Sequence, residues 1–293
     1  MENENFSRQI AEFVEKSHGW FYTESIYKAF SLTIKKDKDN TRQALHRLVV
    51  KGLLIPHPKD DGKFRKVENE LLEMNFNTAN PNAEFPVLWP FGLEEYVKLM
   101  PKSIVVVAGS PNAGKTAFLL NVVAKNQGKQ HIVYFNSEMA VEEMKLRLDL
   151  FDDMGEGWCF QAFERSGNFA DVIFPDSLNI IDFMEINDEF YKIAGELAAI
   201  HDKLKKGIAI IAIQKNPPKK DMKGKTVSTD MGRGGAFGLE KPRLYLAMDA
   251  GTLKIVKAKI WKDPKINPNN KEFHFKLVNG SKFVNVTEVI NPQ

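Results

Sequence analysis

Apolar and polar positions follow two different patterns along this chain. In the first quarter, apolar side chains recur every three or four positions, as they do on amphipathic helices. The predicted helices cover residues 6–17, 24–32 and 41–51. Asp39 or Asn40 is expected to cap the third helix, and Gly52 to end it. Two short strand-like runs then flank Asp61-Gly62, a dipeptide that favours a hairpin turn.

The third predicted helix has an apolar face and a polar face. The apolar face consists of Leu45, Leu48 and Val49. The polar face carries Arg42, Gln43, His46 and Arg47, and the hairpin adds Lys63, Arg65 and Lys66. Three helices followed by a hairpin resemble a winged helix-turn-helix domain over residues 1–67. The resemblance implies that the polar face enters the major groove of DNA while the hairpin contacts phosphates. A protein-contact module of the same shape is the alternative, and the thirteen basic and eleven acidic side chains of residues 1–70 do not decide between the two.

Beyond this segment the pattern changes. Residues 68–86 are rich in Asn and Pro and show little periodicity, which indicates a linker. In residues 87–293, apolar runs of strand length alternate with helix-like stretches. The strand-like runs are SIVVVAG, HIVYFNSE, LNIIDF, GIAIIAIQ, PRLYLAMD, LKIVKAKIW, FHFKLV and KFVNV. This order predicts an α/β fold in which helices flank a mostly parallel sheet, with an antiparallel extension at the C-terminal end.

Composition narrows the class of protein. Of the 293 residues, 43% are apolar, which is enough for a globular core. A single cysteine, Cys159, excludes a disulfide framework and a cysteine-rich zinc site and suits a reducing cytosol. No apolar run approaches the ~20 residues of a membrane span, and the polar start MENENFSRQ does not resemble a secretory signal. We therefore expect a soluble, cytoplasmic protein with no membrane partner.

The formal net charge of +3 is unevenly distributed. Residues 136–190 hold fourteen acidic and three basic side chains, a net of −11. Residues 215–233 hold six basic and two acidic side chains, a net of +4, and residues 254–282 hold eight and two, a net of +6. The two positive segments suit contact with a polyanion. Lysines that solvate loops and edge strands explain the charge equally well.

The segment GSPNAGKT fits the pattern G-x-x-x-x-G-K-[ST] at every fixed position, between a strand-like and a helix-like run. Its residues are Gly109, Ser110, Pro111, Asn112, Ala113, Gly114, Lys115 and Thr116. The two glycines let backbone N–H groups point at a phosphate, and the following helix adds its N-terminal partial charge. Lys115 is expected to reach the β- and γ-phosphates, and the Thr116 hydroxyl to bind Mg²⁺. The sequence therefore predicts binding of ATP with Mg²⁺.

Three further polar residues come at the ends of apolar strand-like runs. Glu138 follows HIVYFNS, Asp182 ends LNIID, and Gln214 ends GIAIIAIQ. In an open α/β sheet, ligands bind at the carboxyl ends of the strands. If these strands neighbour the strand before the phosphate loop, the three side chains lie beside the γ-phosphate. A solvated acid at the start of a helix is the alternative for Glu138.

These motifs resemble those of RecA/DnaB-type ATPases, and the replicative helicase branch more than the recombinase branch. The matching segments are FNSEMAVEEMKLRL, which contains Arg147, NIIDFMEI, AIIAIQKN and KIVKAKIWKDP. Together with the chemistry, the resemblance implies a RecA-like fold over residues 87–293. In it, Asp182 holds Mg²⁺ through water and Glu138 polarises the attacking water. Gln214 senses the γ-phosphate, and Lys115 completes the catalytic set.

The resemblance also implies that the loop after Gln214 grips single-stranded DNA by its phosphates. The residues suited to this are Lys219, Lys220, Lys223, Lys225 and Arg233. A disordered linker is the alternative, because long loops in compact domains are usually functional or disordered. In the resembled family, basic fingers also complete the active site of a neighbouring subunit. Here they would be Lys257, Lys259 and Lys262, without the arginine that the family usually carries.

The leading hypothesis from the sequence is an Mg²⁺-dependent ATPase that assembles into a homo-oligomeric ring or filament and acts on DNA. Such a protein would be a helicase or a remodelling motor of a replication or mobile-element system, recruited by its N-terminal domain. The alternative is a DNA-binding regulator or sensor in which ATP switches oligomerisation with little turnover.

Overall fold

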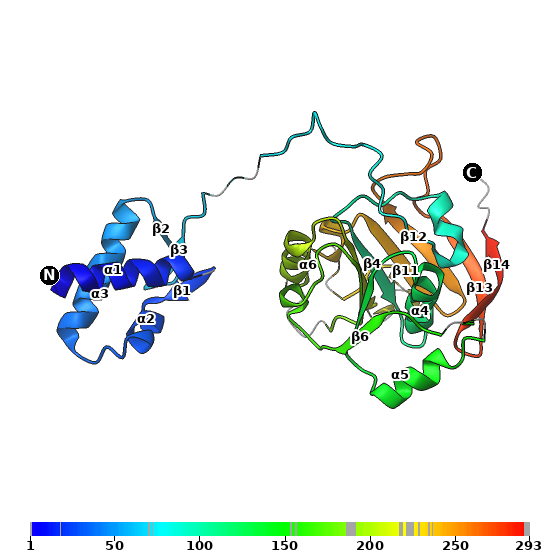
Figure 1. Ribbon diagram of the computed structural model, residues 1–293, viewed down its shortest axis with the longest axis horizontal. Helices are drawn as coiled ribbons and strands as arrows, with labels where there is room; N and C mark the ends of the chain where they lie inside the picture. Colours follow the sequence, from blue (N-terminus) through cyan, green and yellow to red (C-terminus); the bar gives the residue numbers. More distant parts are fainter. Residues whose placement is uncertain are drawn as a thin grey trace. The chain divides into compact units, whose positions relative to one another are not determined.

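The computed structural model describes residues 2–17, 19–69, 71, 73–152, 154–155, 157–185, 192–216, 219–220, 226–227, 229–233, 235 and 237–289. The chain divides into two compact units, Met1–Ala79 and Asn80–Gln293, which are described separately (Figure 1). The division falls within the segment 68–86.

The small unit contains three helices and a three-stranded antiparallel sheet. The helices are α1 (Glu2–Lys16), α2 (Thr23–Ala29) and α3 (Lys35–Val50), and the strands are β1 (Trp20–Tyr22), β2 (Leu54–Pro56) and β3 (Lys63–Lys66), in the order β1-β3-β2. Their core is made of buried apolar side chains from every helix and two of the strands: Ile10, Val14, Phe21, Ile26, Ala44, Leu45 and Leu54. Burial of these faces explains why short elements with ordinary propensities are ordered together.

Helix α3 differs from the sequence prediction at its start. It begins at Lys35 rather than at residue 41, so Asp39 and Asn40 lie inside the helix and the predicted cap is wrong. The residue before it, Ile34, makes no side-chain capping bond. Inside the helix, Thr41 satisfies its hydroxyl by donating it to the carbonyl of Asp37 at 2.8 Å. At the other end Gly52 takes a left-handed φ of 70° after the last turn, as predicted.

The large unit is built on a nine-stranded sheet with the order β14-β13-β12-β11-β4-β8-β7-β5-β6. The strands are β4 (Ile104–Gly109), β5 (Ile132–Asn136), β6 (Gln161–Glu164), β7 (Leu178–Asp182), β8 (Ile208–Gln214), β11 (Leu244–Asp249), β12 (Thr252–Ala258), β13 (Glu272–Val278) and β14 (Lys282–Glu288). From β11 to β6 the strands are parallel, and from β11 to β14 they are antiparallel. The predicted α/β fold, with a mostly parallel sheet and an antiparallel C-terminal extension, is confirmed.

Helices cover both faces of this sheet. They are α4 (Lys115–Asn126), α5 (Val141–Leu148), α6 (Lys192–Lys203) and α7 (Phe237–Glu240), with 3₁₀ turns η1 (Pro90–Glu95) and η2 (Phe169–Asp171). Helix α4 packs on one face and α6 on the other, and they flank the sheet in Figure 1. Side chains of β4 alternate between the two cores, with Val105 in the first and Val106 in the second. Because both faces are buried, the inner parallel strands β4, β5, β7, β8 and β11 are mostly apolar runs.

Two features of the large unit are missing from the sequence prediction. Strand β6 extends the parallel edge of the sheet and has four exposed residues, so it lacks the apolar run that marks the other strands. Within the loop after β8, β9 (Lys219–Lys220) pairs with β10 (Thr226–Val227) as a short antiparallel ladder. None of the helices in the described ranges is long and apolar enough to cross a membrane.

Candidate functional site

The loop between β4 and α4 has the geometry that its glycines predict. Gly114 caps the helix in the left-handed region, with φ 92° and ψ 24°. A Cβ atom on Gly109 would lie 2.6 Å from Cγ of Lys115, so a larger residue there would displace the lysine stem. The N–H of Ser110 donates to the carbonyl of Met248 at 3.1 Å, which ties the loop to β11. The loop is therefore held between α4 and two strands.

Lys115 lies in the first turn of α4 and folds back over the loop. Its Nζ donates to the carbonyl oxygens of Gly109 at 3.1 Å and Ser110 at 3.0 Å. Burial lowers the pKa of Lys115, and the negative charges of Asp182 and Glu138 oppose that shift. The ammonium of Lys115 is thus close enough to both predicted acids for their charges to affect its pKa.

Strand order brings the predicted polar residues to the same edge of the sheet. Strand β8 borders β4, and Gln214 is the register partner of Gly109. Strands β7 and β5 follow in turn, with Asp182 opposite Asn136. The condition that all three strands neighbour β4 is met directly only by β8. The acids reach the site from the second and third strands beyond β4.

Asp182 is the most buried acid of the site, with 5% of the residue exposed. Tyr134 donates its hydroxyl to Oδ2 of Asp182 at 2.6 Å, and the Thr116 hydroxyl is close enough to lower the pKa of the same carboxyl group. Burial raises the pKa of Asp182, while the hydrogen bond from Tyr134, the Thr116 hydroxyl and the charge of Lys115 act in the opposite direction. The carboxylate therefore lies directly beside the hydroxyl that the sequence assigns to a cation.

Glu138 stands on the turn between β5 and α5. The buried side chain of Asn136 shapes this turn, because its Oδ1 accepts the N–H groups of Glu138 at 3.3 Å and Met139 at 3.0 Å. Burial raises the pKa of Glu138, the charge of Asp182 raises it further, and Lys115 lowers it. The charges of Asp182 and Lys115 thus both affect the pKa of Glu138.

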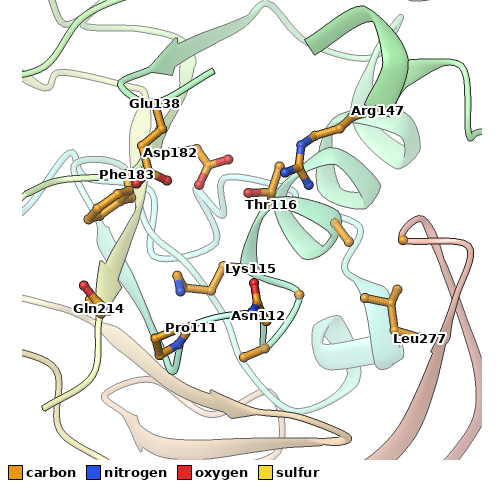
Figure 2. A pocket seen from close by; sticks show the side chains of 14 residues that line it. Pro111, Asn112, Lys115, Thr116, Glu138, Arg147, Asp182, Phe183, Gln214 and Leu277 are labelled. Atoms are coloured by element: carbon orange, nitrogen blue, oxygen red, sulfur yellow. The ribbon is translucent and has the colours of Figure 1, made fainter. Parts of the chain in front are cut away.

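These residues line one cavity of about 400 Å³ (Figure 2). Its walls are Pro111, Asn112, Ala113, Gly114, Lys115, Thr116, Ala117, Glu138, Arg147, Asp182, Phe183, Gln214, Leu277 and Gly280. In Figure 2 the side chains of Lys115, Thr116, Glu138 and Asp182 point into the same space, and Arg147 extends toward Thr116 from α5. Gly109 and Ser110 precede the lining residues in the same loop.

Leu277 and Gly280 are wall residues that the sequence does not predict. They belong to the β13–β14 hairpin, which is fixed beside α4 by side-chain bonds to backbone. Asn121 of α4 donates to the carbonyl of Ser281 at 2.6 Å, and the Ser281 hydroxyl donates to the carbonyl of Leu150 at 2.7 Å. No sequence pattern in the hairpin predicts its contact with α4, because that contact depends on the strand order of the sheet.

Lys215, the residue after Gln214, has a structural role that the sequence does not predict. Its side chain is 3% exposed, and Nζ lies 2.7 Å from Oδ2 of Asp249 and 3.7 Å from Oδ1 of Asp230. Lys254 pairs with the same Asp230 at 2.8 Å. The charge of Lys215 is thus neutralised by ion pairs within the unit. The sequence alone instead groups Lys215 with the loop lysines expected to be solvent-exposed.

The α3 residues predicted to contact DNA are all on the surface of the small unit, while the hairpin residues Lys63, Arg65 and Lys66 are half-buried. Arg42, Gln43, His46 and Arg47 are exposed on α3. Arg42 pairs with Asp39 at 3.1 Å. On the hairpin, Lys63 pairs with Asp60 at 2.8 Å and Lys66 with Glu15 at 2.6 Å. The hairpin lysines therefore already have acidic partners within the unit.

The predicted DNA-binding loop is described in part. Lys219 and Lys220 form β9, Arg233 donates its N–H to the carbonyl of Gln214 at 2.7 Å, and Lys223 and Lys225 lie outside the described residues. The N–H of Lys215 donates to the carbonyl of Gly109 at 3.0 Å. Both stems of the loop are thus attached to the end of β8 and the start of the phosphate loop.

The three predicted finger lysines lie away from the cavity of their own chain. Lys257 is at the end of β12, next to Ala258, which pairs with Leu244 at the start of β11. That edge of the sheet is opposite the carboxyl ends where the cavity lies. Burial lowers the pKa of Lys257, with further lowering by Lys259 and Arg243. Lys262 pairs with Glu84 at 3.1 Å.

No protein-family model and no curated protein sequence matches the chain. Among solved structures, it is similar to a KaiC-like protein of the hyperthermophilic archaeon Pyrococcus horikoshii OT3, with 14% identity, coverage of 71% of this chain and 99% of that one, and a TM-score of 0.48. It is also similar to the RadB recombinase, with 14% identity, coverage of 61% and 89%, and a TM-score of 0.41. At this level of similarity, function has to be inferred from the chain's own site.

Proposed function

We propose that this chain is an Mg²⁺-dependent ATPase of the RecA/DnaB type that acts on DNA, as a helicase or a remodelling motor of a replication or mobile-element system. The observation that carries the proposal is a single cavity lined by the phosphate loop, two carboxylates from different strands and the amide of Gln214. Perturbed acids that converge in a cleft with a phosphate-binding loop are typical of nucleotide hydrolysis.

The triphosphate would be held by the loop and the start of α4. The backbone N–H groups of Asn112, Gly114, Lys115 and Thr116 and the N-terminal end of the helix favour anionic oxygens. Lys115 supplies a positive charge at the same place, and Arg147 adds a second cation to the cavity wall. Both cations would neutralise charge that develops on the transferred phosphoryl group.

The residues at the bottom of the cavity fit a magnesium ion. Among the described residues there is no cluster of three or more His, Cys, Asp or Glu side chains, so protein ligands alone would not surround a cation here. Mg²⁺ is commonly bound by one or two protein oxygens, waters and substrate phosphates, so Thr116 would supply one protein oxygen and Asp182 would hold the ion through a bound water. The bound ion would shield the charge of the phosphates. Glu138 would take the proton of the attacking water, for which its raised pKa is suitable.

Contact with DNA would be controlled through Gln214. Its carbonyl accepts the N–H of Arg233, and its neighbour Lys215 is bonded to Gly109. A shift of Gln214 after loss of the γ-phosphate would therefore move both stems of the loop that carries Lys219, Lys220, Lys223, Lys225 and Arg233. Binding through lysines would follow the phosphate backbone with little preference for sequence.

Catalysis would be completed between subunits of a ring or filament. Lys257 and Lys259 lie on the sheet edge opposite their own cavity, which suits action on a neighbouring subunit. The missing arginine favours slower hydrolysis than a forked guanidinium contact would give. Exposed residues of α3 in the small unit would recruit the protein to duplex DNA as a winged helix does, unless that surface contacts another protein. The single cysteine suits the reducing conditions of a cytoplasm.

The second candidate function is a DNA-binding regulator in which ATP switches assembly with little turnover. It is favoured by the lysine fingers, two of which already have partners in their own chain: Lys257 donates to the carbonyl of Leu239, and Lys262 pairs with Glu84. A strand-separation assay on a forked duplex decides between the two. Unwinding that requires ATP supports the motor, whereas an ATP-dependent change of mass and duplex affinity without unwinding supports the switch.

A further inference from the structure

Tyr134 is a buried residue whose polar group contacts the site without facing the cavity. It lies on β5 on the sheet face that packs against α4, and none of its surface is exposed. Its register partner on β7 is Ile180, while Asp182 is opposite Asn136. The tyrosine is long enough to reach the diagonal neighbour, so its hydroxyl donates to Oδ2 of Asp182 at 2.6 Å.

We propose that Tyr134 is the positioning residue of the cation-binding carboxylate. Its hydroxyl occupies Oδ2 of Asp182 from inside the core, so the carboxylate stays oriented toward Thr116 and the cavity. This role rests on the proposed function, because it concerns the acid assigned to Mg²⁺. It adds a residue that the phosphate-loop motif and the strand-end pattern do not identify.

The surroundings of Tyr134 make its hydroxyl a fixed donor. The ring packs in the apolar core under α4, with the ring of Phe160 at a centroid distance of 5.9 Å. A ring held on all sides cannot turn its hydroxyl elsewhere without breaking the close packing. Asp182 is 5% exposed, so little water is available to replace the lost donor if the hydroxyl is removed.

Orientation of a carboxylate matters for this cation in particular. Mg²⁺ demands near-ideal octahedral geometry and keeps several of its waters, so a carboxylate that holds one of those waters has to be well oriented too. Hydrogen-bond partners behind metal-binding residues set that geometry, and their removal typically lowers metal affinity by about 10–100-fold. A hydroxyl behind Asp182 is therefore expected to affect cation binding more than nucleotide binding itself.

The same strand face also orients the second acid. Asn136 lies two residues after Tyr134, so their side chains leave β5 on the same side. Its Oδ1 holds the turn that carries Glu138, as described above. One face of β5 thus supports both carboxylates, with Tyr134 directed at Asp182 and Asn136 at the turn of Glu138.

The test is Tyr134→Phe in the full-length chain, which removes the hydroxyl and keeps the ring. Binding of a non-hydrolysable ATP analogue is measured by calorimetry over a series of Mg²⁺ concentrations and without Mg²⁺. We expect the half-saturating Mg²⁺ concentration to rise about 10-fold or more, with unchanged affinity in the absence of Mg²⁺. Thermal melting reports whether the variant is folded.

The matched control is Tyr245→Phe. Tyr245 is equally buried, but it packs in the core on the other face of the sheet and its hydroxyl accepts the N–H of Gly232 at 2.8 Å. Its loss should leave the Mg²⁺ dependence at the wild-type value. If Tyr245→Phe shifts the dependence as much as Tyr134→Phe, a general loss of packing explains both and the positioning role is wrong.

A double-mutant cycle gives a second test. In an Asp182→Ala background the added Tyr134→Phe change should have no further effect on Mg²⁺ dependence, because the group it positions is gone. Additive effects of the two changes would overturn the proposal, as would a wild-type Mg²⁺ dependence in Tyr134→Phe. A wild-type chain that binds no nucleotide at any Mg²⁺ concentration would contradict the proposed function, and this role with it.

Discussion

The ammonium of Lys215 and the carboxylate of Asp249 lie 2.7 Å apart, between the carboxyl ends of β8 and β11. These two strands border β4 on either side, so the pair bridges the strand that carries the phosphate loop. The backbone N–H of Lys215 also donates to Gly109 at the end of β4. The ion pair therefore fixes the first stem of the proposed DNA-binding loop beside the cavity that the phosphate loop lines.

Asp249→Ala should destabilise the large unit. It leaves the ammonium of Lys215, which is 3% exposed, with only the more distant Asp230. Breaking a buried ion pair costs about 3–5 kcal/mol of folding free energy. Because Asp249 is partly exposed, we expect a loss of about 2–3 kcal/mol. Urea unfolding followed by tryptophan fluorescence measures it. The control Asp149→Ala breaks the exposed pair with Lys145 and should cost less than about 1 kcal/mol. Equal losses in the two variants would contradict the structural role of the pair.

Lys115→Ala should abolish tight nucleotide binding. Its ammonium lies against the carbonyls of the predicted phosphate loop, and hydrogen bonds to charged groups are worth about 1.5–3 kcal/mol, or roughly 10–100-fold in affinity. Binding of a fluorescent ATP analogue to the full-length chain provides the measurement. Lys129→Ala, an exposed lysine after α4, is the control and should bind as wild type does. Retained affinity in Lys115→Ala would remove the phosphate loop from nucleotide binding.

Glu138→Gln should keep nucleotide binding and lose hydrolysis. The amide has nearly the same size but cannot accept the proton of water, and general-base catalysis typically contributes about 10²–10⁴-fold. Phosphate release and analogue affinity are measured in parallel. Glu142→Gln, an exposed acid in the first turn of α5, should behave as wild type. Unchanged hydrolysis in Glu138→Gln would exclude Glu138 as the base.

The rate of hydrolysis should have an acid limb above the usual range of a glutamate. Burial and the charge of Asp182 raise the pKa of Glu138, so the active carboxylate form is reached only at a pH above that raised value. As pH falls through it, Glu138 is protonated and the rate declines. A pH profile of turnover at saturating ATP records the limb. A wild-type rate that stays flat down to the ordinary pKa of glutamate would contradict the assignment.

Mixing two inactive variants should restore activity if the fingers act between subunits. Lys115→Ala has an empty site but intact fingers, and Lys259→Ala has an intact site without the exposed finger lysine. In a mixed assembly, the first subunit can supply Lys259 to the second. ATPase activity of the mixture should exceed the sum of the separate variants, and mixing Lys115→Ala with Glu138→Gln should give no such gain. The absence of any gain in the first mixture would argue against action in trans.

Residues whose place on the cavity wall follows from their own strand or loop could be predicted from the sequence. The phosphate loop, Asp182 and Gln214 each stand at a fixed position relative to one apolar run, and the sheet then brings their ends together. Tyr134 and Leu277 could not be predicted in this way, since each becomes part of the site only through its neighbour in the sheet or the fold of a distant hairpin. In the same way, the sequence does not distinguish Lys215 from the other lysines of the loop, because its partner Asp249 is adjacent only in the fold.

The elements that sequence analysis missed lack the patterns on which it depends. Strand β6 is exposed along its whole length, so no apolar alternation marks it. The first turn of α3 contains charged residues without a capping side chain, which hides its true start at Lys35. Both elements are ordered by neighbours in space, β6 by β5 and α3 by the apolar core of the small unit.

The hairpin that closes the cavity has a consequence for synthesis of the protein. Asn121 in the helix of the phosphate loop and Ser281 in the hairpin are bonded although 160 positions separate them. A growing chain exposes its phosphate loop on the ribosome long before the hairpin emerges, and domains generally form as whole units. Under the proposed function, the nascent protein would gain full affinity for nucleotide only after the hairpin has emerged, so shorter nascent chains would not consume ATP.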